Sequence, residues 1–517
     1  MKKIYMEQRT ERRISAALRL GLVAVLLVVQ IVLVVVLSNL LHQYMAAAYV
    51  VLELVAIVYA LRIYNRPGCS TYKPSWILLI LAVPVVGLIL YWLWNGDEPK
   101  KRLTLRKLPM PKLTAEERTQ SQRNVEKLAQ KTPNAARIAS YLDRQGFALY
   151  NRSDTVYFST GEAYLQDMLE KMRQAEHFIF MEYFILANGA IWQEMMAIFR
   201  EKVKIGVEIK IIYDDFGSMM RMQPEQIMQL REMGAEVKAF NPVHHYVNRL
   251  YFNYRDHRKI TAIDGNIAYT GGANIADEYA NLITRFGYWK DCGVRLTGEG
   301  VWGLTREFLY QWERLGGEMH SEWDYYRPDD CATQSGFCQS FVDGPDNNPV
   351  STAEEVFLQL ISLAKKEVYI TTPYLAIGEP MIKALCVAGD SGVDVRLMMP
   401  GVPDHKLAYM VAECYFGELL SHGVKIFSYE PGILHGKSVM VDGEAAFIGS
   451  VNMDYRSFQL HFECGTMLYG MPAIEDLRRD MDDIVAHSHE MTHGEWAHRA
   501  WYRRLIGPVL KLFAMWI

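Results

Sequence analysis

The chain has 517 residues, 50 % of them hydrophobic, and a formal net charge of −4 at pH 7, so it is long enough for several domains with a large core. The slight negative charge excludes the global basic field that nucleic-acid binders usually carry, and we expect no nucleic-acid partner. The seven cysteines are odd in number and lack CxxC spacing, which argues against a zinc site or a disulfide framework.

Residues 1–95 are predicted to form a transmembrane anchor. Three apolar segments, 20–41, 44–61 and 76–94, each come near the length that crosses a bilayer. A signal peptide is the competing interpretation of the first segment, but that segment is long, lacks a small-residue cleavage site and precedes two more apolar segments. We therefore expect a multi-pass protein of the cell membrane. Lys and Arg flank both the first and the third segment, so the positive-inside rule favours neither orientation.

Two similar α/β units are predicted to follow a linker. Residues 96–137 are charged and punctuated by proline, as expected of a partly helical linker. Residues 138–330 and 331–486 then repeat one order: a strand, a helical stretch, a second strand and a strand with a catalytic motif. Short apolar runs that alternate with helical patterns indicate an α/β fold with a covered sheet. We expect the two units to pack as a pseudo-dimer with their motifs at the interface.

Each unit contains one copy of the motif HxKx₄D. The two copies comprise His257, Lys259, Asp264, His435, Lys437 and Asp442, all of which we take as catalytic candidates. Residues two apart on a strand share a face, so each His and Lys would face one site. A neutral imidazole can attack phosphorus, and a protonated one can donate to the leaving alkoxide. The lysines would bind the non-bridging oxygens, so no metal or cofactor is expected.

A similar tail follows each motif. Gly272 and Asn274 lie in the first tail, Ser450 and Asn452 lie in the second, and each Asn comes ten residues after the Asp. Backbone N–H groups and amides at these positions would stabilise developing negative charge. These four residues are therefore predicted to bind phosphate. A purely structural duplication is the alternative, and the chemistry carried by both copies argues against it.

The C-terminal residues 487–517 mix tryptophans and other apolar side chains with arginines and a lysine. This composition is typical of an amphipathic helix at a membrane interface. A terminal helix packed on the body of the protein is an equally good interpretation.

The motifs resemble those of the phospholipase D superfamily and, within it, the bacterial cardiolipin synthases. The resemblance extends over roughly residues 113–517 and includes Thr372-Pro373-Tyr374 and the run 449–458. Cys292 and His461 depart from the family pattern, in which Thr and Asn are commoner at these positions.

The resemblance also implies residues that orient the histidines. In this superfamily an acidic residue further along the chain orients each catalytic histidine. The candidates are Asp291, 34 residues after His257, and Glu463, 28 residues after His435.

The function implied by the resemblance is that of a phosphatidyltransferase. It would make cardiolipin and glycerol from two phosphatidylglycerol molecules through a phosphatidyl-histidine, with His257 as nucleophile and His435 as general acid and base. The alternatives are a membrane-bound phosphodiester hydrolase of the phospholipase D type, or a transferase that uses phosphatidylethanolamine as donor. A non-catalytic lipid-binding module is disfavoured, because both motifs are intact. Membrane phospholipids are the expected partners, and the sequence predicts no particular oligomer.

Overall fold

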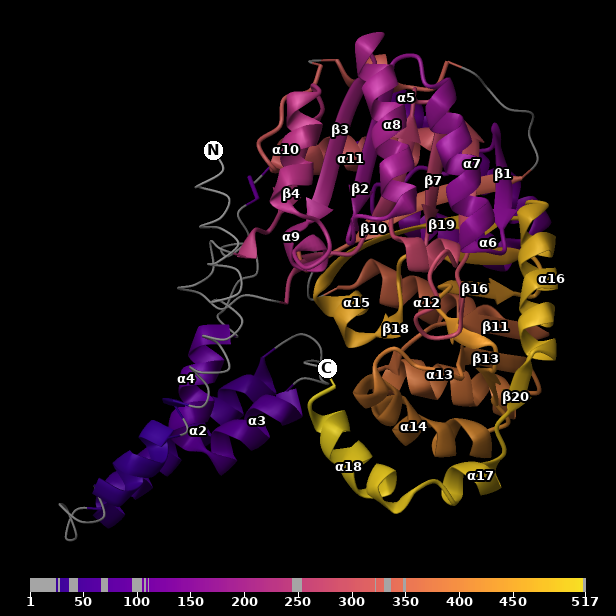
Figure 1. The fold of residues 1–517 in the computed structure, drawn as a ribbon. Coiled ribbons are helices and arrows are strands. Elements are labelled where there is room, and N and C mark those ends of the chain that lie inside the picture. The colour runs from indigo at the N-terminus through magenta and orange to yellow at the C-terminus, as the bar shows by residue number, and fades with distance from the viewer. Residues whose placement is uncertain are drawn as a thin grey trace.

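The computed structural model describes residues 25–26, 28–36, 45–66, 73–94, 105–106, 108–109, 111–243, 253–320, 322–329, 336–346 and 350–514. Figure 1 shows a large body of sheets and helices, with an arm of N-terminal helices beside it. The body contains both copies of the catalytic motif.

The first sheet has seven strands in the order β1-β9-β7-β6-β2-β3-β4. The strands β2, β3 and β4 are parallel, and the others pair antiparallel. Their bounds are β1 Ser153–Phe158, β2 Phe178–Tyr183, β3 Glu208–Asp214, β4 Glu236–Phe240, β6 Lys259–Ile263, β7 Ile267–Gly271 and β9 Gly293–Gly298.

The second sheet repeats this order. Its strands run β10-β19-β17-β16-β11-β13-β14, with β20 added at the edge. Their bounds are β10 Phe337–Asp343, β11 Glu367–Thr371, β13 Asp394–Pro400, β14 Lys425–Tyr429, β16 Ser438–Val441, β17 Ala445–Gly449, β19 His461–Tyr469 and β20 Ser488–Glu490. The repeated order confirms the predicted duplication of one α/β unit.

Helices cover the sheets, because apolar side chains on one face of each helix pack onto a largely buried strand surface. In the first unit they are α7 Gly161–Gln174, α8 Ala190–Lys204, α9 Asp215–Ser218, α10 Pro224–Glu232 and α11 Val301–Arg314. In the second unit they are α12 Thr352–Leu363, α13 Glu379–Asp390, α14 Lys406–Ser421, α15 Tyr455–Gln459 and α16 Ala473–Ala486.

The two units pack as the predicted pseudo-dimer, and they exchange elements. One buried cluster contains Ala268 and Leu296 of the first sheet together with Ile448 and Leu468 of the second. The last helix of each unit contacts the first strand of the other, α11 on β10 and α16 on β1. Two short strands also cross between the units, since β5 (Arg255–Asp256) pairs with β19, and β8 (Tyr288–Lys290) pairs with β15 (Gly432–Leu434).

The segment predicted as a linker, residues 96–137, is a packed part of the body from Ala115 onward. It forms two helices there, α5 (Ala115–Lys131) and α6 (Pro133–Arg144). Residues of α6 lie in the hydrophobic core of the second unit, although the sequence places most of this helix in the first. The side-chain amide of Gln339 on β10 donates to the carbonyl oxygens of Ala139 and Phe147, which anchors this segment. Residues 115–144 are therefore part of the catalytic body.

Among the described residues, one helix is long and apolar enough to cross a membrane. It lies at residues 47–65 within α2 (Met45–Asn65), and most of its apolar side chains are exposed. The predicted segment 76–94 is divided at Pro84 into α3 (Lys73–Ala82) and α4 (Pro84–Trp94), and each half is too short to span. Much of the predicted segment 20–41 lies outside the described residues. The expected three spans are therefore not supported, and one candidate span remains.

The C-terminal segment 487–517 begins with the edge strand β20, which the sequence did not predict. Two helices follow, α17 (His493–Ala497) and α18 (Trp501–Leu512), and both lie against α14. Figure 1 shows α18 ending beside α3 of the N-terminal arm, where the Ser75 hydroxyl donates to the carbonyl oxygen of Leu512.

Candidate active site

The two exchanged strand pairs place the motif histidines at the interface of the units. His257 follows β5, and its backbone N–H donates to the carbonyl oxygen of Phe462 on β19 at 2.8 Å. His435 follows β15, and its backbone N–H donates to the carbonyl oxygen of Lys290 on β8 at 2.7 Å. Each histidine is therefore held by the backbone of the opposite unit, at the residue just before that unit's acidic candidate.

The orienting acids consequently act across the interface. His257 Nδ1 lies 2.9–3.0 Å from the two carboxylate oxygens of Glu463, and His435 Nδ1 lies 2.7 Å from Asp291 Oδ2. All four side chains are buried. The sequence identified both acids, but the implied pairing within each copy is wrong, because each acid contacts the histidine of the other unit. A carboxylate at Nδ1 holds the proton there and leaves Nε2 with a free lone pair.

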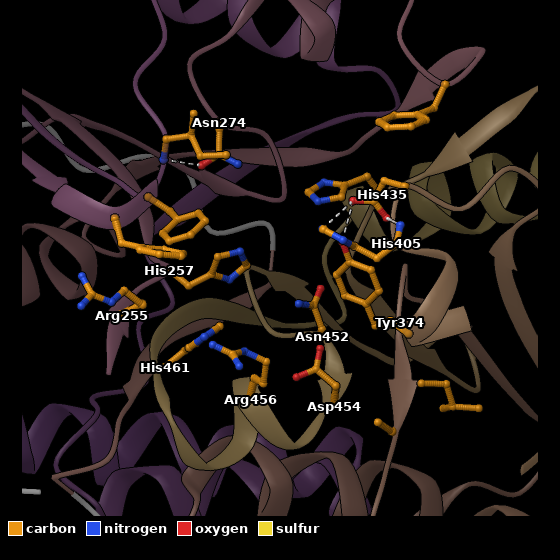
Figure 2. Close-up of a pocket in the computed structure, with 18 of the residues that line it drawn as sticks. Arg255, His257, Asn274, Tyr374, His405, His435, Asn452, Asp454, Arg456 and His461 are labelled. Carbon is orange, nitrogen blue, oxygen red and sulfur yellow. Dashed lines mark hydrogen bonds and ion pairs between the residues drawn. The ribbon is translucent and has the colours of Figure 1, made fainter. Parts of the chain in front are cut away.

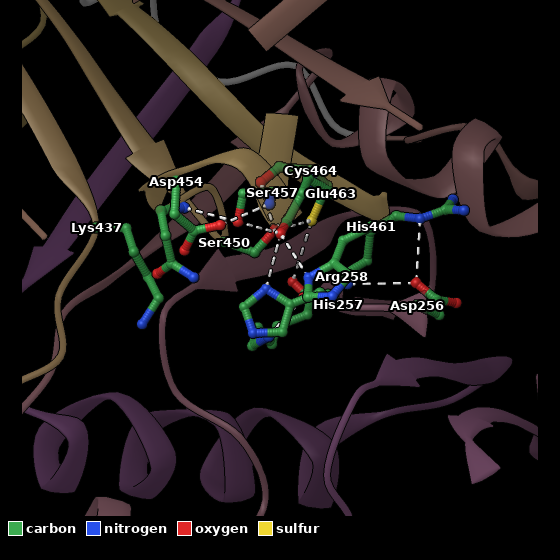
Figure 3. A network of polar contacts seen from close by, with 12 residues as sticks. Asp256, His257, Arg258, Lys437, Ser450, Asp454, Ser457, His461, Glu463 and Cys464 are labelled. Carbon is green, nitrogen blue, oxygen red and sulfur yellow. Dashed lines mark hydrogen bonds and ion pairs between the residues drawn. The ribbon is translucent and has the colours of Figure 1, made fainter. Parts of the chain in front are cut away.

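Glu463 is the centre of a buried polar network (Figure 3). Ser457 donates to Oε1 at 2.7 Å, and the Ser450 hydroxyl donates to Oε2. Hydrogen bonds to an ionised carboxylate stabilise its charge, so these hydroxyls keep Glu463 available as an acceptor for His257.

The two motif lysines lie beside the histidines. Lys437 Nζ is 2.8 and 3.0 Å from the ring nitrogens of His435, and Lys259 Nζ donates to the carbonyl oxygen of His257. Burial lowers the pKa of Lys259 to about 7 and that of Lys437 to about 8. The mutual repulsion of the ammonium groups contributes at Lys259. An anion placed between them would reverse these shifts, as expected of a phosphate-binding site.

Both catalytic histidines favour the neutral form in this environment. Burial, followed by the charge of Lys259, holds the pKa of His257 well below its usual 6.5. Burial and Lys437 also lower the pKa of His435, while Asp291 opposes the shift. The charge of Asp291 thus favours the protonated form of His435.

A cavity of about 530 Å³ contains both histidines (Figure 2). Aromatic rings border each of them, Phe184 at 5.2 Å from the His257 ring and Trp289 at 5.3 Å from the His435 ring. Other lining residues are Ile185, Phe216, Arg255, Asn274, Tyr279, Tyr374, Asp404, His405, Val411, Asn452, Asp454, Arg456, His461 and Ala514.

The predicted phosphate-binding residues divide into two pairs. Asn274 and Asn452 line the cavity. Gly272 and Ser450 instead support the orienting acids, because a Cβ at Gly272 would collide with Asp291, and the Ser450 hydroxyl donates to Glu463. These two positions correspond in the repeat, and each supports an orienting acid. Gly272 leaves room for Asp291, whereas Ser450 donates a hydrogen bond to Glu463.

Asp264 and Asp442 do not line the cavity, contrary to their prediction as catalytic residues. Each has a positive φ, 52° and 54°, in the tight turn between two strands of its sheet. The Asp264 carboxylate accepts backbone N–H groups from residues 176–178 at 2.8 Å, and Asp442 does the same for residues 365–367. The geometry gives both aspartates a structural role in fixing the catalytic strand to its neighbour.

His257, His461 and Glu463 have potential metal-ligating atoms within 4.8 Å of one another in the described part of the chain. The carboxylate of Glu463 already accepts from two serines, and the ammonium groups of Lys259 and Lys437 would repel a cation. This arrangement suits an anion better than a metal ion.

Several cavity residues were not identified from sequence patterns. Asp404, His405 and Arg456 lie outside both motifs, and they reach the cavity from the loop before α14 and from α15. His461 was noted only as a departure from a family pattern. A carboxyl-end position after a parallel strand is the signal that could have indicated Asp404, since ligands bind at such edges.

Comparisons with known proteins agree with this geometry. The family model "Cardiolipin synthase, PLD-like domain" matches residues 168–283 and 357–485, and "Phospholipase_D-nuclease N-terminal" matches residues 51–95. A cardiolipin synthase of Halalkalibacterium halodurans is 32% identical over 482 residues, which cover 91% of this chain and 94% of the relative. The chain belongs to the cardiolipin synthase family of phospholipase D-like enzymes.

One further sequence relative and one solved structure are similar to this chain. An uncharacterized protein of Streptococcus mutans is 35% identical over 444 residues, or 85% of this chain and 95% of the relative. The crystal structure of phosphatidylserine synthase from Haemophilus influenzae has the same fold, with a TM-score of 0.55 and 15% identity, and covers 74% of this chain and 97% of that one. The fold of this cardiolipin synthase family member is therefore shared with a solved structure.

Proposed function

We propose that this enzyme makes cardiolipin and glycerol from two phosphatidylglycerol molecules. In the first step, Nε2 of His257 attacks the phosphorus of one lipid and the bond to the glycerol oxygen breaks. His435, protonated, gives its proton to that oxygen, and glycerol leaves. The phosphatidyl group is then held on His257 by a P–N bond.

In the second step His435 acts as a base, and the phosphatidyl group leaves His257. Neutral His435 takes the proton from a headgroup hydroxyl of the second phosphatidylglycerol, whose oxygen attacks phosphorus while the P–N bond breaks. Cardiolipin forms, and both histidines return to their starting states. Lys259, Lys437 and the amide of Asn452 would stabilise the charge that develops on the non-bridging oxygens in both steps.

The observation that carries this proposal is the pair of crosswise His–carboxylate contacts facing one cavity, His257 with Glu463 and His435 with Asp291. Two imidazoles at one site, each with Nδ1 beside a carboxylate, suit a double displacement better than a single attack by water. The named relatives support cardiolipin as the product. Hydrolysis of the same intermediate by water, and phosphatidylethanolamine as donor, are the alternatives to be tested.

The test uses the full-length protein in detergent with labelled phosphatidylglycerol as its one lipid. We expect cardiolipin and glycerol in equal amounts, without nucleotide or divalent metal. Phosphatidic acid as the main product would identify a hydrolase. Turnover that requires phosphatidylethanolamine, or that stops when a chelator is added, would contradict the proposed reaction.

We also propose that the enzyme is held at the cell membrane by α2 and by one face of α18. On α18, Trp501, Leu505 and Val509 follow one another at helical spacing and are 74%, 66% and 54% exposed. The other side of the helix is fixed to the body, since Arg503 pairs with Glu413 at 3.0 Å on α14. Large apolar side chains exposed in a row suit the interfacial layer of a bilayer.

The position of α18 supports a role in lipid entry. Its end contacts α3 through Ser75, and Ala514, just beyond it, lines the catalytic cavity together with Val411 of α14. A membrane against α18 would therefore lie next to the cavity, where the substrates of a lipid-modifying enzyme must enter.

Glutamates at Leu505 and Val509 test this role of α18. In the full-length enzyme, the double variant should turn over phosphatidylglycerol in vesicles at least tenfold more slowly, because two charges oppose interfacial burial. Turnover of short-chain phosphatidylglycerol dispersed in water should be unchanged. Ile205→Glu is the matched control, since Ile205 is 67% exposed and follows α8. Equal losses on both substrates would contradict a membrane role.

A further inference from the structure

The two ends of the catalytic cavity differ in chemical character, although the motifs that build it are repeated. Beside His257 lie two cationic side chains, Arg255 and Arg456, and His461, whose pKa burial lowers to about 3 (Figure 2). Beside His435 the lining contains Tyr374, Asp404 and His405. Arg221 and Arg285 also line the cavity, and both pair with Glu278. The charge of Asp404 favours the protonated form of His435, but the binding of a phosphate does not explain a carboxylate that faces the cavity at this end.

Asp404 is a fixed, largely buried carboxylate. Its Oδ2 accepts from the Tyr374 hydroxyl at 2.7 Å, and its Oδ1 accepts from the backbone N–H of His405 at 2.9 Å. Its side chain is 13% exposed, so it contacts the cavity while most of it is enclosed. Each oxygen retains lone pairs for another donor. The other carboxylate among the described lining residues, Asp454, is occupied as the N-cap of α15.

The repeat shows that this arrangement is specific to one end. Phe178 and Glu367 are equivalent, because their carbonyl oxygens accept the backbone N–H of Asp264 and Asp442, respectively. Seven residues beyond Phe178 is Ile185, and seven beyond Glu367 is Tyr374. At this position of the cavity lining the first unit has the apolar Ile185, and the second unit has Tyr374, whose phenol donates to Asp404.

The proposed reaction places a glycerol headgroup at the His435 end. His435 protonates the leaving glycerol oxygen and later activates the attacking hydroxyl. The glycerol headgroup of each phosphatidylglycerol molecule therefore lies beside His435 in one of the two steps. The hydroxyls of a glycerol headgroup that do not react are donors, and a carboxylate that accepts them would fix the headgroup relative to His435.

We infer that Asp404, positioned by Tyr374, binds the hydroxyl groups of the glycerol headgroup and makes the enzyme selective for polyol headgroups over simple alcohols. This inference rests on the proposed function, and it adds a specificity-determining carboxylate to it. A plain structural role at the start of α14 is the competing explanation, and it predicts no change in selectivity.

Acceptor competition tests the inference. Full-length enzyme in detergent receives phosphatidylglycerol as donor, with labelled glycerol and 1-propanol at equal concentrations as acceptors. The wild type should transfer phosphatidyl groups to both and favour glycerol, whose additional hydroxyls reach Asp404. Asp404→Ala should lower the ratio of glycerol to propanol product by about tenfold or more, because a site built for a hydroxyl rejects analogues that lack it. The rate with propanol should fall much less.

Two further variants keep the test independent of folding. Tyr374→Phe keeps the ring and removes the hydrogen bond to Asp404, so it should shift the ratio in the same direction by a smaller factor. Asp390→Asn is the matched control, since Asp390 pairs with His422 on the surface of the same unit and should leave the ratio unchanged.

The outcomes separate the inference from the reaction on which it rests. Transfer to both acceptors with an unchanged ratio in Asp404→Ala and Tyr374→Phe overturns the headgroup site and leaves the transferase standing. No transfer to either acceptor by the wild type overturns the proposed function and the headgroup site together. Equal losses with both acceptors in the variants assign Asp404 to structure alone.

Discussion

The two halves of the active site share one backbone plan and differ in the side chains that complete it. Both sheets have the same strand order, and each motif histidine is hydrogen-bonded to the backbone and the acid of the opposite unit. The supporting residues differ, with Gly272 beneath Asp291 but Ser450 beside Glu463. Duplication therefore explains the geometry of the site, and the differing supporting residues agree with the separate tasks that we propose for the two histidines.

The crosswise contacts also explain why neither unit is complete alone. A single unit would contain a histidine without its carboxylate and an acid without its histidine. The exchanged strands β5 and β8 fix this arrangement over only a few residues, so assembly of the two units and formation of the site are the same event.

Replacement of the histidines should have the largest effect and tests their division of labour. His257→Ala and His435→Ala should each lower turnover by on the order of 10⁴-fold or more, as when a nucleophile or its base is removed. In His435→Ala the first step would lack its acid and the second its base, so phosphatidyl-His257 should be detectable by mass spectrometry of digested protein. In His257→Ala we expect no adduct. An adduct on His435 in that background would reverse the assignment.

Replacement of the acids tests the crosswise pairing. Glu463→Gln should slow formation of the phosphatidyl-enzyme, because it disturbs the tautomer of His257. Asp291→Asn should slow its breakdown more than its formation, so the adduct should accumulate. Losses of about 10²–10⁴-fold are expected for each. Rapid-quench measurement of both steps distinguishes the acids, and the reverse pattern would show that each acid serves the histidine of its own unit.

The corresponding residues Gly272 and Ser450 should differ in sensitivity. Gly272→Ala places a methyl group against the Asp291 carboxylate and should lower turnover by about 10²-fold, since a displaced orienting group misaligns the histidine. Ser450→Ala removes one hydrogen bond to Glu463 and should cost about tenfold. Steady-state rates on phosphatidylglycerol, with circular dichroism to verify folding, decide between them. Similar losses would show that the two positions are equivalent in function as well as in sequence.

Much of this architecture could be predicted from the sequence. The repeated HxKx₄D motifs indicated duplication and a pseudo-dimer, and the resemblance to the phospholipase D superfamily implied both orienting acids. The crosswise pairing could not be predicted, because β5 and β15 are too short to leave a pattern and their partners lie in the other unit. The roles of Asp264 and Asp442 were misassigned, although the following glycines, Gly265 and Gly443, form the Asp-Gly pairs typical of tight hairpin turns. Asp404 lacked any motif, since its role depends on a neighbour 30 residues away, Tyr374.

Loss of the proton from His435, whose pKa is lowered from 6.5, and loss of charge from the two lysines should together set the alkaline side of the pH profile. Burial lowers the pKa of Lys259 to about 7 and of Lys437 to about 8, so both lose their charge as pH rises through this range in the free enzyme. A bound phosphodiester stabilises the charged forms and raises both values. The alkaline limb of kcat/KM, which reports the free enzyme, should therefore lie at lower pH than that of kcat.

The acid limb of the same profile should reflect the need for a neutral His257, whose pKa lies well below 6.5. The apparent values belong to the coupled groups together. Measurement of both parameters from pH 5 to 10 tests the order of the limbs. A kcat limb at lower pH than the kcat/KM limb would show that substrate does not bind between the lysines.

The smallest effect on catalysis is expected at Asp264 and Asp442, where the two halves are most alike. Each carboxylate accepts three backbone N–H groups at the start of a parallel strand, and neither contacts the cavity. Asparagine at either position retains the tendency for positive φ and loses the charge, which should cost about 1–3 kcal/mol of unfolding free energy. The turnover number of the folded fraction should stay within about twofold of the wild type. Denaturant unfolding combined with active-site titration separates the two quantities. A large fall in turnover number without a loss of stability would return these aspartates to the catalytic machinery, and a loss in one variant alone would show that the two hairpins carry unequal shares of the stability.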